Sequence, residues 1–198
     1  MFVAVFKDNT MRLVFAFFTC CIASVAFGQH TAEPHQQTGH GTHSMKGAHR
    51  LTLGLGHTHI SEGVIDGKTE WVTAGSWSFN YDYWLSDSWA IGLQNDLVLE
   101  TFFVEDREKE VIERSYPWSI VPVAIYKPFK RLSFLGGVGL EFATEKNLTL
   151  TRLGVEYGFH LPKNWEVGAA LVWDNKWNYY NSWGLAITIS RIWPKRVH

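Results

Sequence analysis

The feature that most constrains the fold is a repeated alternation of large apolar residues with small or polar residues, beginning near residue 50. From Trp71 to Tyr83 the odd positions are mainly aromatic, whereas the even positions are mostly small or polar. Successive side chains of a strand point to opposite faces, so this pattern predicts a strand with one apolar face and one small, polar face. The same pattern returns at 89–103, 132–142, 151–160, 165–174 and 183–193. Two less regular segments, 49–60 and 118–126, bring the predicted number of strands to eight.

The identity of the inward face separates a soluble barrel from a membrane barrel. In a soluble barrel of the lipocalin type, large apolar residues fill the interior and charged residues cover the outside. Here the polar face is rich in Gly, Ala and Ser, which suit the narrow lumen of an eight-stranded barrel. The apolar face carries aromatic residues near strand ends, such as Trp165 and Trp173, as expected for girdles at the two membrane interfaces. The sequence therefore predicts an all-β fold, a transmembrane antiparallel up-and-down β-barrel.

The first 28 residues are predicted to be a cleaved secretory signal peptide. The basic residues Lys7 and Arg12 precede an apolar run, 13–27, that ends in Ala-Phe-Gly. Both cysteines, Cys20 and Cys21, lie inside this run, so a mature chain beginning near Gln29 has none. Disulfide, zinc-thiolate and cysteine-nucleophile chemistry are thereby excluded. Lipoprotein cleavage at Cys20 is an alternative, although small residues are missing before it.

The remaining chain divides into an arm and a barrel. Residues 29–48 are polar, rich in His and without an apolar period, which predicts a flexible periplasmic arm, and the barrel follows at 49–198. The connections 85–88, 127–131 and 161–164 are short, whereas 105–114 and 175–181 are longer. Short periplasmic turns and longer outer loops are the usual arrangement of outer-membrane barrels. The net charge of −1, spread along the chain, gives no basic patch for nucleic acid.

The region from about His49 to Trp193 resembles the small eight-stranded outer-membrane β-barrel proteins of diderm bacteria, a porin-like group that includes the OmpA-, OmpX- and OmpW-like barrels. The resemblance rests on the alternation and on the final segment, 184–193, which is similar to the terminal strand recognised by the barrel-assembly machinery. It departs from the family pattern because Pro194–His198 extend past the terminal aromatic residue. The resemblance implies an outer-membrane location, a lipid environment and the assembly machinery as a partner, but no activity.

The charged residues predicted to face the lumen form the first candidate site. They are Asp82, Asp96, Glu100, Glu141, Arg152, Glu156, His160, Glu166 and Asp174. One interpretation is a network of ion pairs that fills the lumen, with Arg152 as its central bridge. The alternative is an acidic interior that passes or binds small cations. We expect Glu100, Glu141, Arg152 and Asp174 in the outer half of the barrel, and Asp82, His160 and Glu166 in the periplasmic half.

The histidines form a second candidate site. Imidazole binds zinc, copper or nickel, and His35, His40, His43, His57 and His59 are close together in sequence. Weak metal binding and a merely polar arm are both compatible with this composition. No other cofactor is expected.

An outer-membrane enzyme that modifies lipids, or one that acts on peptides, is the third possibility. His57, His59, Ser61 and Glu62 could supply a base, a nucleophile and an orienting group near the outer rim, although Ser61 and Glu62 are expected in a loop. The charged segment 105–114 is interpreted as a solvated loop rather than as a recognition site for adhesion. The favoured function is a non-enzymatic structural or porin-like barrel with an acidic lumen.

Overall fold

The computed structural model describes residues 44–105 and 108–195. Ten strands in these residues form a single sheet, and one short 3-10 helix lies outside it. The predicted signal peptide and most of the arm lie outside these residues. The elements are β1 (His49–Ile65), β2 (Lys68–Trp84), β3 (Trp89–Val98), β4 (Thr101–Glu105), β5 (Val111–Ser115), β6 (Trp118–Tyr126), β7 (Leu132–Phe142), β8 (Leu148–Leu161), η1 (Pro162–Asn164), β9 (Trp165–Lys176) and β10 (Asn181–Trp193).

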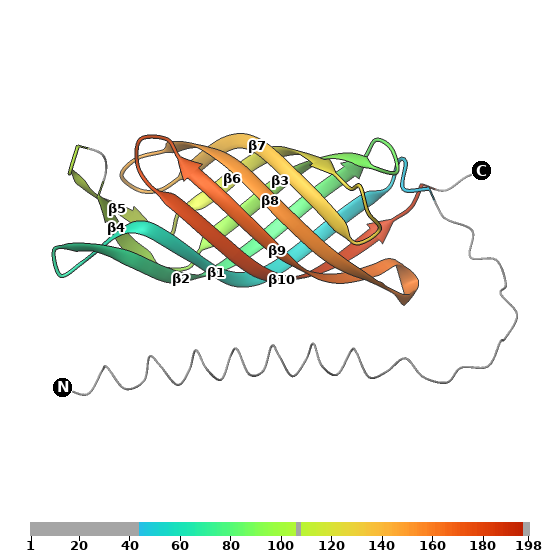
Figure 1. Ribbon diagram of the computed structural model, residues 1–198, viewed down its shortest axis with the longest axis horizontal. Helices are drawn as coiled ribbons and strands as arrows, with labels where there is room; N and C mark the ends of the chain where they lie inside the picture. Colours follow the sequence, from blue (N-terminus) through green and yellow to red (C-terminus); the bar gives the residue numbers. More distant parts are fainter. Residues whose placement is uncertain (1–43, 106–107, 196–198) are drawn as a thin grey trace, which may run out of the picture. The chain divides into compact units, whose positions relative to one another are not determined.

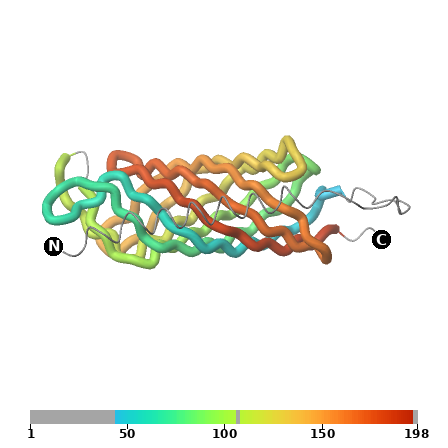
Figure 2. The backbone as a smooth tube through the Cα atoms, turned by 60° about the horizontal axis from the view of Figure 1, so that its bottom comes forward, coloured from blue at the N-terminus to red at the C-terminus, as the bar shows by residue number. Residues whose placement is uncertain are grey.

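Eight of the strands close into an antiparallel up-and-down barrel. Neighbours in the sheet are neighbours in the chain, apart from the hairpin of β4 and β5, and β10 pairs with β1 to close the ring. The closing register sets Leu53 opposite Ile189. The strands cross the long axis of the barrel obliquely, as Figure 2 shows. The predicted fold class is therefore confirmed.

The two strands outside the barrel form an extension at one end. The hairpin of β1 and β2 projects beyond the other strands together with β4 and β5 (Figure 1). Gly63 of β1 pairs with Val104 of β4, beside an irregularity between Ile60 and Gly63. The prediction of one strand over 89–103 is wrong, because β3 ends at Val98 and β4 begins at Thr101. The predicted loop 105–114 is partly strand, since β5 pairs with β4.

The two ends of the barrel differ in their connections. One end, here called the loop end, carries the projecting hairpins β1–β2 and β4–β5. There an Asp66-Gly67 pair joins β1 to β2 with φ angles of 53° and 74°. Positive φ at both central residues is typical of the two-residue turns that suit twisted hairpins. At the opposite end, here called the termini end, short turns join β2 to β3, β6 to β7 and β8 to β9. The described start of the chain and the end of β10 also meet there (Figure 1).

A turn at 44–48 is held against the termini end. The Ser44 hydroxyl and the Met45 N–H donate hydrogen bonds of 2.8 and 2.7 Å to Asp87 Oδ1. These two bonds lower the pKa of Asp87 below its ordinary value, with the Ser44 bond contributing most. Ala48 is buried and its backbone pairs with that of Trp84. The turn therefore covers part of this end of the barrel.

The outward surface is an apolar band between two aromatic girdles. Among its most exposed side chains are Leu55, Ile187 and Leu153, from the middle of the strands. Trp173 and Trp183 pair near the loop end, while Trp89 and Tyr126 pair near the termini end. The aromatic positions 183 and 193 of β10 are ten residues apart, which corresponds to roughly 33 Å of strand and roughly 25 Å at a tilt of about 40°. That height matches the hydrocarbon band of a membrane barrel. No helix among the described residues is long and apolar enough to span a membrane.

Candidate functional site: the barrel lumen

The lower part of the lumen, near the termini end, is organised around one arginine. Arg50 of β1 is 4% exposed and lies opposite Asp82 of β2 in the strand register. Its Nε is 2.7 Å from Asp82 Oδ2, its Nη2 is 2.7 Å from Glu156 Oε2, and its Nη1 is 3.2 Å from Glu166 Oε1. One guanidinium therefore binds three carboxylates that come from three different strands. We call this group the lower cluster.

Two further basic groups approach the lower cluster from its outer edge, at the termini end. Lys127 Nζ, from the turn between β6 and β7, is 3.7 Å from Glu166 Oε2 and lies over the ring of Trp84. His160 Nε2 is 3.3 Å from the same carboxylate oxygen, and its side chain is 48% exposed. Neither contact is a hydrogen bond, since Glu166 Oε2 has no hydrogen-bond partner in the described part of the chain. The rim of the cluster is therefore held less tightly than its centre.

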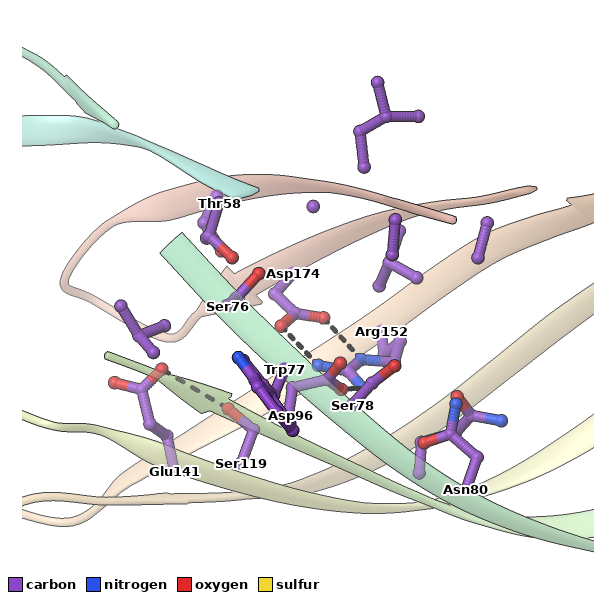
Figure 3. Close-up of a pocket in the computed structure, with 18 of the residues that line it drawn as sticks. Thr58, Ser76, Trp77, Ser78, Asn80, Asp96, Ser119, Glu141, Arg152 and Asp174 are labelled. Atoms are coloured by element: carbon purple, nitrogen blue, oxygen red, sulfur yellow. Dashed lines mark hydrogen bonds and ion pairs between the residues drawn. The ribbon is translucent and has the colours of Figure 1, made fainter. Parts of the chain in front are cut away.

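The upper part of the lumen, toward the loop end, contains a second arginine, on β8. Arg152 is 2% exposed and binds Asp174 through two bonds, from Nε to Oδ1 and from Nη2 to Oδ2, each 2.7 Å long. Figure 3 shows the carboxylate of Asp174 turned toward this guanidinium. Arg152 Nη1 also donates to Asp96 of β3. A planar guanidinium suits such paired binding of a carboxylate.

Two more cations complete the upper cluster. Lys176 Nζ lies 3.3 Å from Asp174 Oδ2 and 3.5 Å from Glu141 Oε2. Arg114, which is fully buried and comes from β5, donates to Glu141 Oε1 over 2.5 Å. Tyr180 also donates a 2.5 Å hydrogen bond to this oxygen. Burial, followed by the charge of Glu141, raises the pKa of Tyr180, so its phenol stays protonated and can donate.

Apolar side chains adjoin both clusters. At the loop end, Ile60, Phe102, Val104 and Leu148 belong to one buried apolar group that spans the barrel and its extension. Near the termini end, Trp84 belongs to another, which continues along the inner side of β6, β7 and β8. The lumen is thus filled by ion-paired clusters and by the apolar side chains packed beside them.

The space left in the lumen is small. A cavity of about 50 Å³ lies among the upper cluster and the polar residues Asn80 and Gln94 (Figure 3). A second, of about 10 Å³, lies beside Arg50 and Glu166. A single water molecule needs roughly 10–15 Å³ of such cavity volume. These cavities therefore suit a few water molecules rather than a wide aqueous channel.

The structure brings together eight of the nine residues predicted to face the lumen. Asp82, Glu156, His160 and Glu166 form the lower cluster or its rim, while Asp96, Glu141, Arg152 and Asp174 belong to the upper cluster. Glu100 is the exception and its placement was wrong. It lies between β3 and β4, is exposed, and accepts a 3.1 Å hydrogen bond from the Gly75 N–H. The strand alternation ends before this residue, so the period of β3 does not apply to it.

Sequence reasoning missed four cations of the lumen, which are Arg50, Arg114, Lys127 and Lys176. With Arg152 they give five cations against six carboxylates in the two clusters. The predicted acid excess is therefore corrected to a nearly balanced interior. Arg50 had a signal in the sequence, because it occupies the same alternating face as Thr52 and Gly54.

The structure describes only some of the histidines and all of the residues of the enzymatic hypothesis. His35, His40 and His43 lie outside the described residues. The rings of His57 and His59 are 5.8 Å apart, and the described residues contain no group of three side chains suited to a metal ion. His59 Nδ1 shares a 2.8 Å hydrogen bond with the Thr73 hydroxyl.

The two remaining residues of the enzymatic hypothesis, Ser61 and Glu62, lie in β1 rather than in a loop. Both accept hydrogen bonds from the Asn181 N–H, over 3.1 Å to Ser61 Oγ and 3.3 Å to Glu62 Oε2. These contacts link β1 to the start of β10. They give Ser61 and Glu62 a structural role at the loop end.

Comparison with known proteins relates this fold to solved structures of outer-membrane barrels. No protein-family model matches the sequence, and a search of curated proteins finds no significant match. The closed eight-stranded antiparallel barrel is the fold of small outer-membrane barrel proteins.

Two crystal structures illustrate the similarity. Neisserial surface protein A matches with a TM-score of 0.54 and 10% identity, over 74% of this chain and 99% of that one. Ail, the attachment invasion locus protein of Yersinia pestis, was crystallised with the heparin analogue sucrose octasulfate. It matches with a TM-score of 0.50 and 13% identity, over 73% of this chain and 99% of that one. At these identities the similarity establishes the fold alone.

Proposed function

We propose that this protein is a bacterial outer-membrane β-barrel that spans the bilayer with a filled, charge-balanced lumen. The observation that carries the proposal is the outward apolar band between two aromatic girdles. A closed barrel leaves no unpaired strand edge in lipid, which is the condition for strands to cross a membrane. The role is structural or porin-like, with loop-end elements presented outside the membrane.

Export and assembly follow from the same proposal. The N-terminal segment acts as a cleaved signal peptide, and the barrel-assembly machinery recognises the final strand β10. The alternation of Leu185, Ile187 and Ile189 with small residues on that strand supports this recognition.

The proposal is tested by reconstitution of the refolded chain into phosphatidylcholine vesicles whose acyl chains carry bromine, a quencher of tryptophan fluorescence. We expect strong quenching relative to vesicles without bromine, because Trp77, Trp89 and Trp183 face outward and are 43–56% exposed in the isolated chain. Resistance of the strands to added protease should accompany the quenching. Unquenched emission from a folded barrel would overturn the proposal.

Passage or binding of small cations is the second candidate function. It is favoured by Asp96, whose side chain is 30% exposed and lines the cavity of about 50 Å³. Cation-selective current steps that zinc blocks, recorded from the wild-type barrel in a planar bilayer, would support this function. A silent bilayer that contains folded barrel would exclude passage and favour the structural role.

Binding of sulfated polyanions, which the complex of Ail suggests, is not favoured for this chain. Nine carboxylates and three lysines are at least partly exposed in the loop-end segments 61–75, 99–105, 108–117 and 143–147. Such a surface repels a polyanion. We therefore expect the loop end to contribute nothing to retention on a heparin column: the Lys68→Gln/Lys109→Gln variant should elute at the same salt concentration as the wild type, and earlier elution of this variant would contradict the expectation.

A further inference from the structure

The termini end of the barrel carries charge of the opposite sign to the loop end. Six basic side chains form what we call the basic rim, and they are Lys46, Lys130, Arg131, Lys163, Arg191 and Lys195. Among the residues described at this end, the exposed acid is Asp87, which accepts hydrogen bonds from Ser44 and Met45. The rim therefore has a clear excess of positive charge.

Two arginines of the basic rim lie over outward aromatic rings. The guanidinium of Arg131 is 5.1 Å from the ring centre of Phe159, and that of Arg191 is 5.2 Å from the ring centre of Trp165. Arg191 follows Ile187 and Ile189 in the row of β10 that faces outward. A contact with the face of an aromatic ring leaves guanidinium N–H groups free to bind another partner.

These groups form one continuous patch across consecutive strands. The Gly158 N–H of β8 donates to the Arg131 carbonyl over 2.8 Å, and Arg191 of β10 pairs with Trp165 of β9. Arg191 also donates to the Lys163 carbonyl in the turn between β8 and β9. The patch thus runs from the start of β7 to the end of β10.

No carboxylate in the described part of the chain forms an ion pair with Arg131, Lys163 or Arg191. This distinguishes them from the cations of the lumen, each of which has an acidic partner. An exposed guanidinium beside an interfacial aromatic residue suits a phosphate group at the level of the lipid headgroups.

We propose that the basic rim binds the phosphate of anionic phospholipid headgroups, over the patch formed by Arg131, Lys163 and Arg191 beside Phe159 and Trp165. This inference rests on the proposed membrane location. The outward position of Arg191, in line with lipid-facing side chains, favours a lipid over an acidic protein as the occupant. Each basic residue near a membrane surface contributes attraction to anionic lipid.

The experiment uses the full chain in phosphatidylcholine vesicles that contain a minor share of phosphatidylglycerol. Bromine is placed on the acyl chains of one lipid or the other, and the quenching of tryptophan gives the relative binding of the two lipids. We expect phosphatidylglycerol to be preferred about fivefold or more. The Arg131→Gln/Arg191→Gln variant should reduce this preference toward one.

A matched control removes the same charge from the opposite end. The Lys68→Gln/Lys109→Gln variant loses two exposed lysines of the loop end and should keep the full preference. If the arginine variant fails to fold, Lys130→Gln/Lys163→Gln removes two exposed charges of the basic rim and should also lower the preference for phosphatidylglycerol.

The outcomes separate this inference from the proposed function. Inserted wild-type barrel with equal quenching by both lipids would overturn the inference and leave the membrane location intact. A preference that survives in both rim variants would overturn it as well. Failure of the folded chain to be quenched in any vesicle would overturn the proposed function, and the lipid site with it.

Discussion

The lower and upper clusters of the lumen each contain three carboxylates but distribute their positive charge differently. In the lower cluster, Arg50 alone binds Asp82, Glu156 and Glu166, and Lys127 only approaches from the rim. In the upper cluster, three cations share three carboxylates, so most acids have two basic neighbours. The comparison shows that equal charge can be balanced by one central residue or by a network. The two arrangements should respond differently to the loss of one cation.

The largest effect is expected from Arg50→Met. The substitution leaves two buried carboxylates and one partly buried carboxylate with only Lys127 and His160 nearby, and breaking a buried ion pair costs roughly 3–5 kcal/mol. Urea denaturation of the barrel folded in detergent micelles should show a correspondingly lower midpoint. A shift no larger than that of Arg152→Ala would contradict the distinction between the clusters.

A smaller effect is expected from Arg152→Ala. Asp96 loses its cation, but Asp174 keeps Lys176 at 3.3 Å and Glu141 keeps Arg114. We expect a loss of about 2–4 kcal/mol, because part of the charge remains paired. An unchanged denaturation midpoint would show that Arg152 is not the bridge of the upper cluster.

Lys176→Met should have a still smaller effect. Arg152 continues to bind Asp174, and Arg114 with Tyr180 continues to bind Glu141, so each carboxylate retains a donor. The expected loss is about 1–2 kcal/mol. A loss equal to that of Arg50→Met would mean that the upper cluster also depends on a single residue.

The smallest effect is expected outside the lumen, from Asp87→Ala, which removes the oxygen that accepts the bonds from Ser44 and Met45. The pKa of Asp87 is lowered in the folded barrel, so its contribution is complete above the ordinary carboxyl pKa of about 3.9 and is lost as the pH falls through the lower folded value. Amide hydrogen exchange at Met45 should be faster in the variant at neutral pH, with the denaturation midpoint unchanged. Slow exchange in the variant would show that Asp87 does not hold the turn.

The barrel was predictable from the sequence because large apolar residues on the outer face of each strand alternate with small or polar residues on its inner face. Arg50 and Lys176 lie on the same alternating face as the small residues of their strands, so both could have been assigned to the lumen. Arg50 was overlooked because its strand alternates only weakly. Lys176 was overlooked because β9 extends two residues beyond the predicted end.

The remaining features depend on contacts between distant parts of the chain. Arg114 enters the lumen only because β5 pairs with β4, and β4 pairs with β1 through the single register contact of Gly63 with Val104. The three partners of Arg50 are up to 116 residues away in sequence. Asp82 lies opposite Arg50 in the pairing of β1 with β2, whereas the closing register of β1 with β10 brings Glu156 and Glu166 to Arg50. Local alternation does not specify that closing register.

The central claim is that the outward surface of the barrel lies in lipid, and one pair of variants tests it most directly. Ile187 is 69% exposed in the middle of β10, whereas Asn147 is exposed in the turn before β8. In a bilayer, Ile187→Lys should lower the free energy of unfolding by roughly 2–4 kcal/mol, and Asn147→Lys should change it little. Equal, small effects of the two lysines on the barrel folded in vesicles would contradict the membrane location, because a lysine at position 187 would then face water.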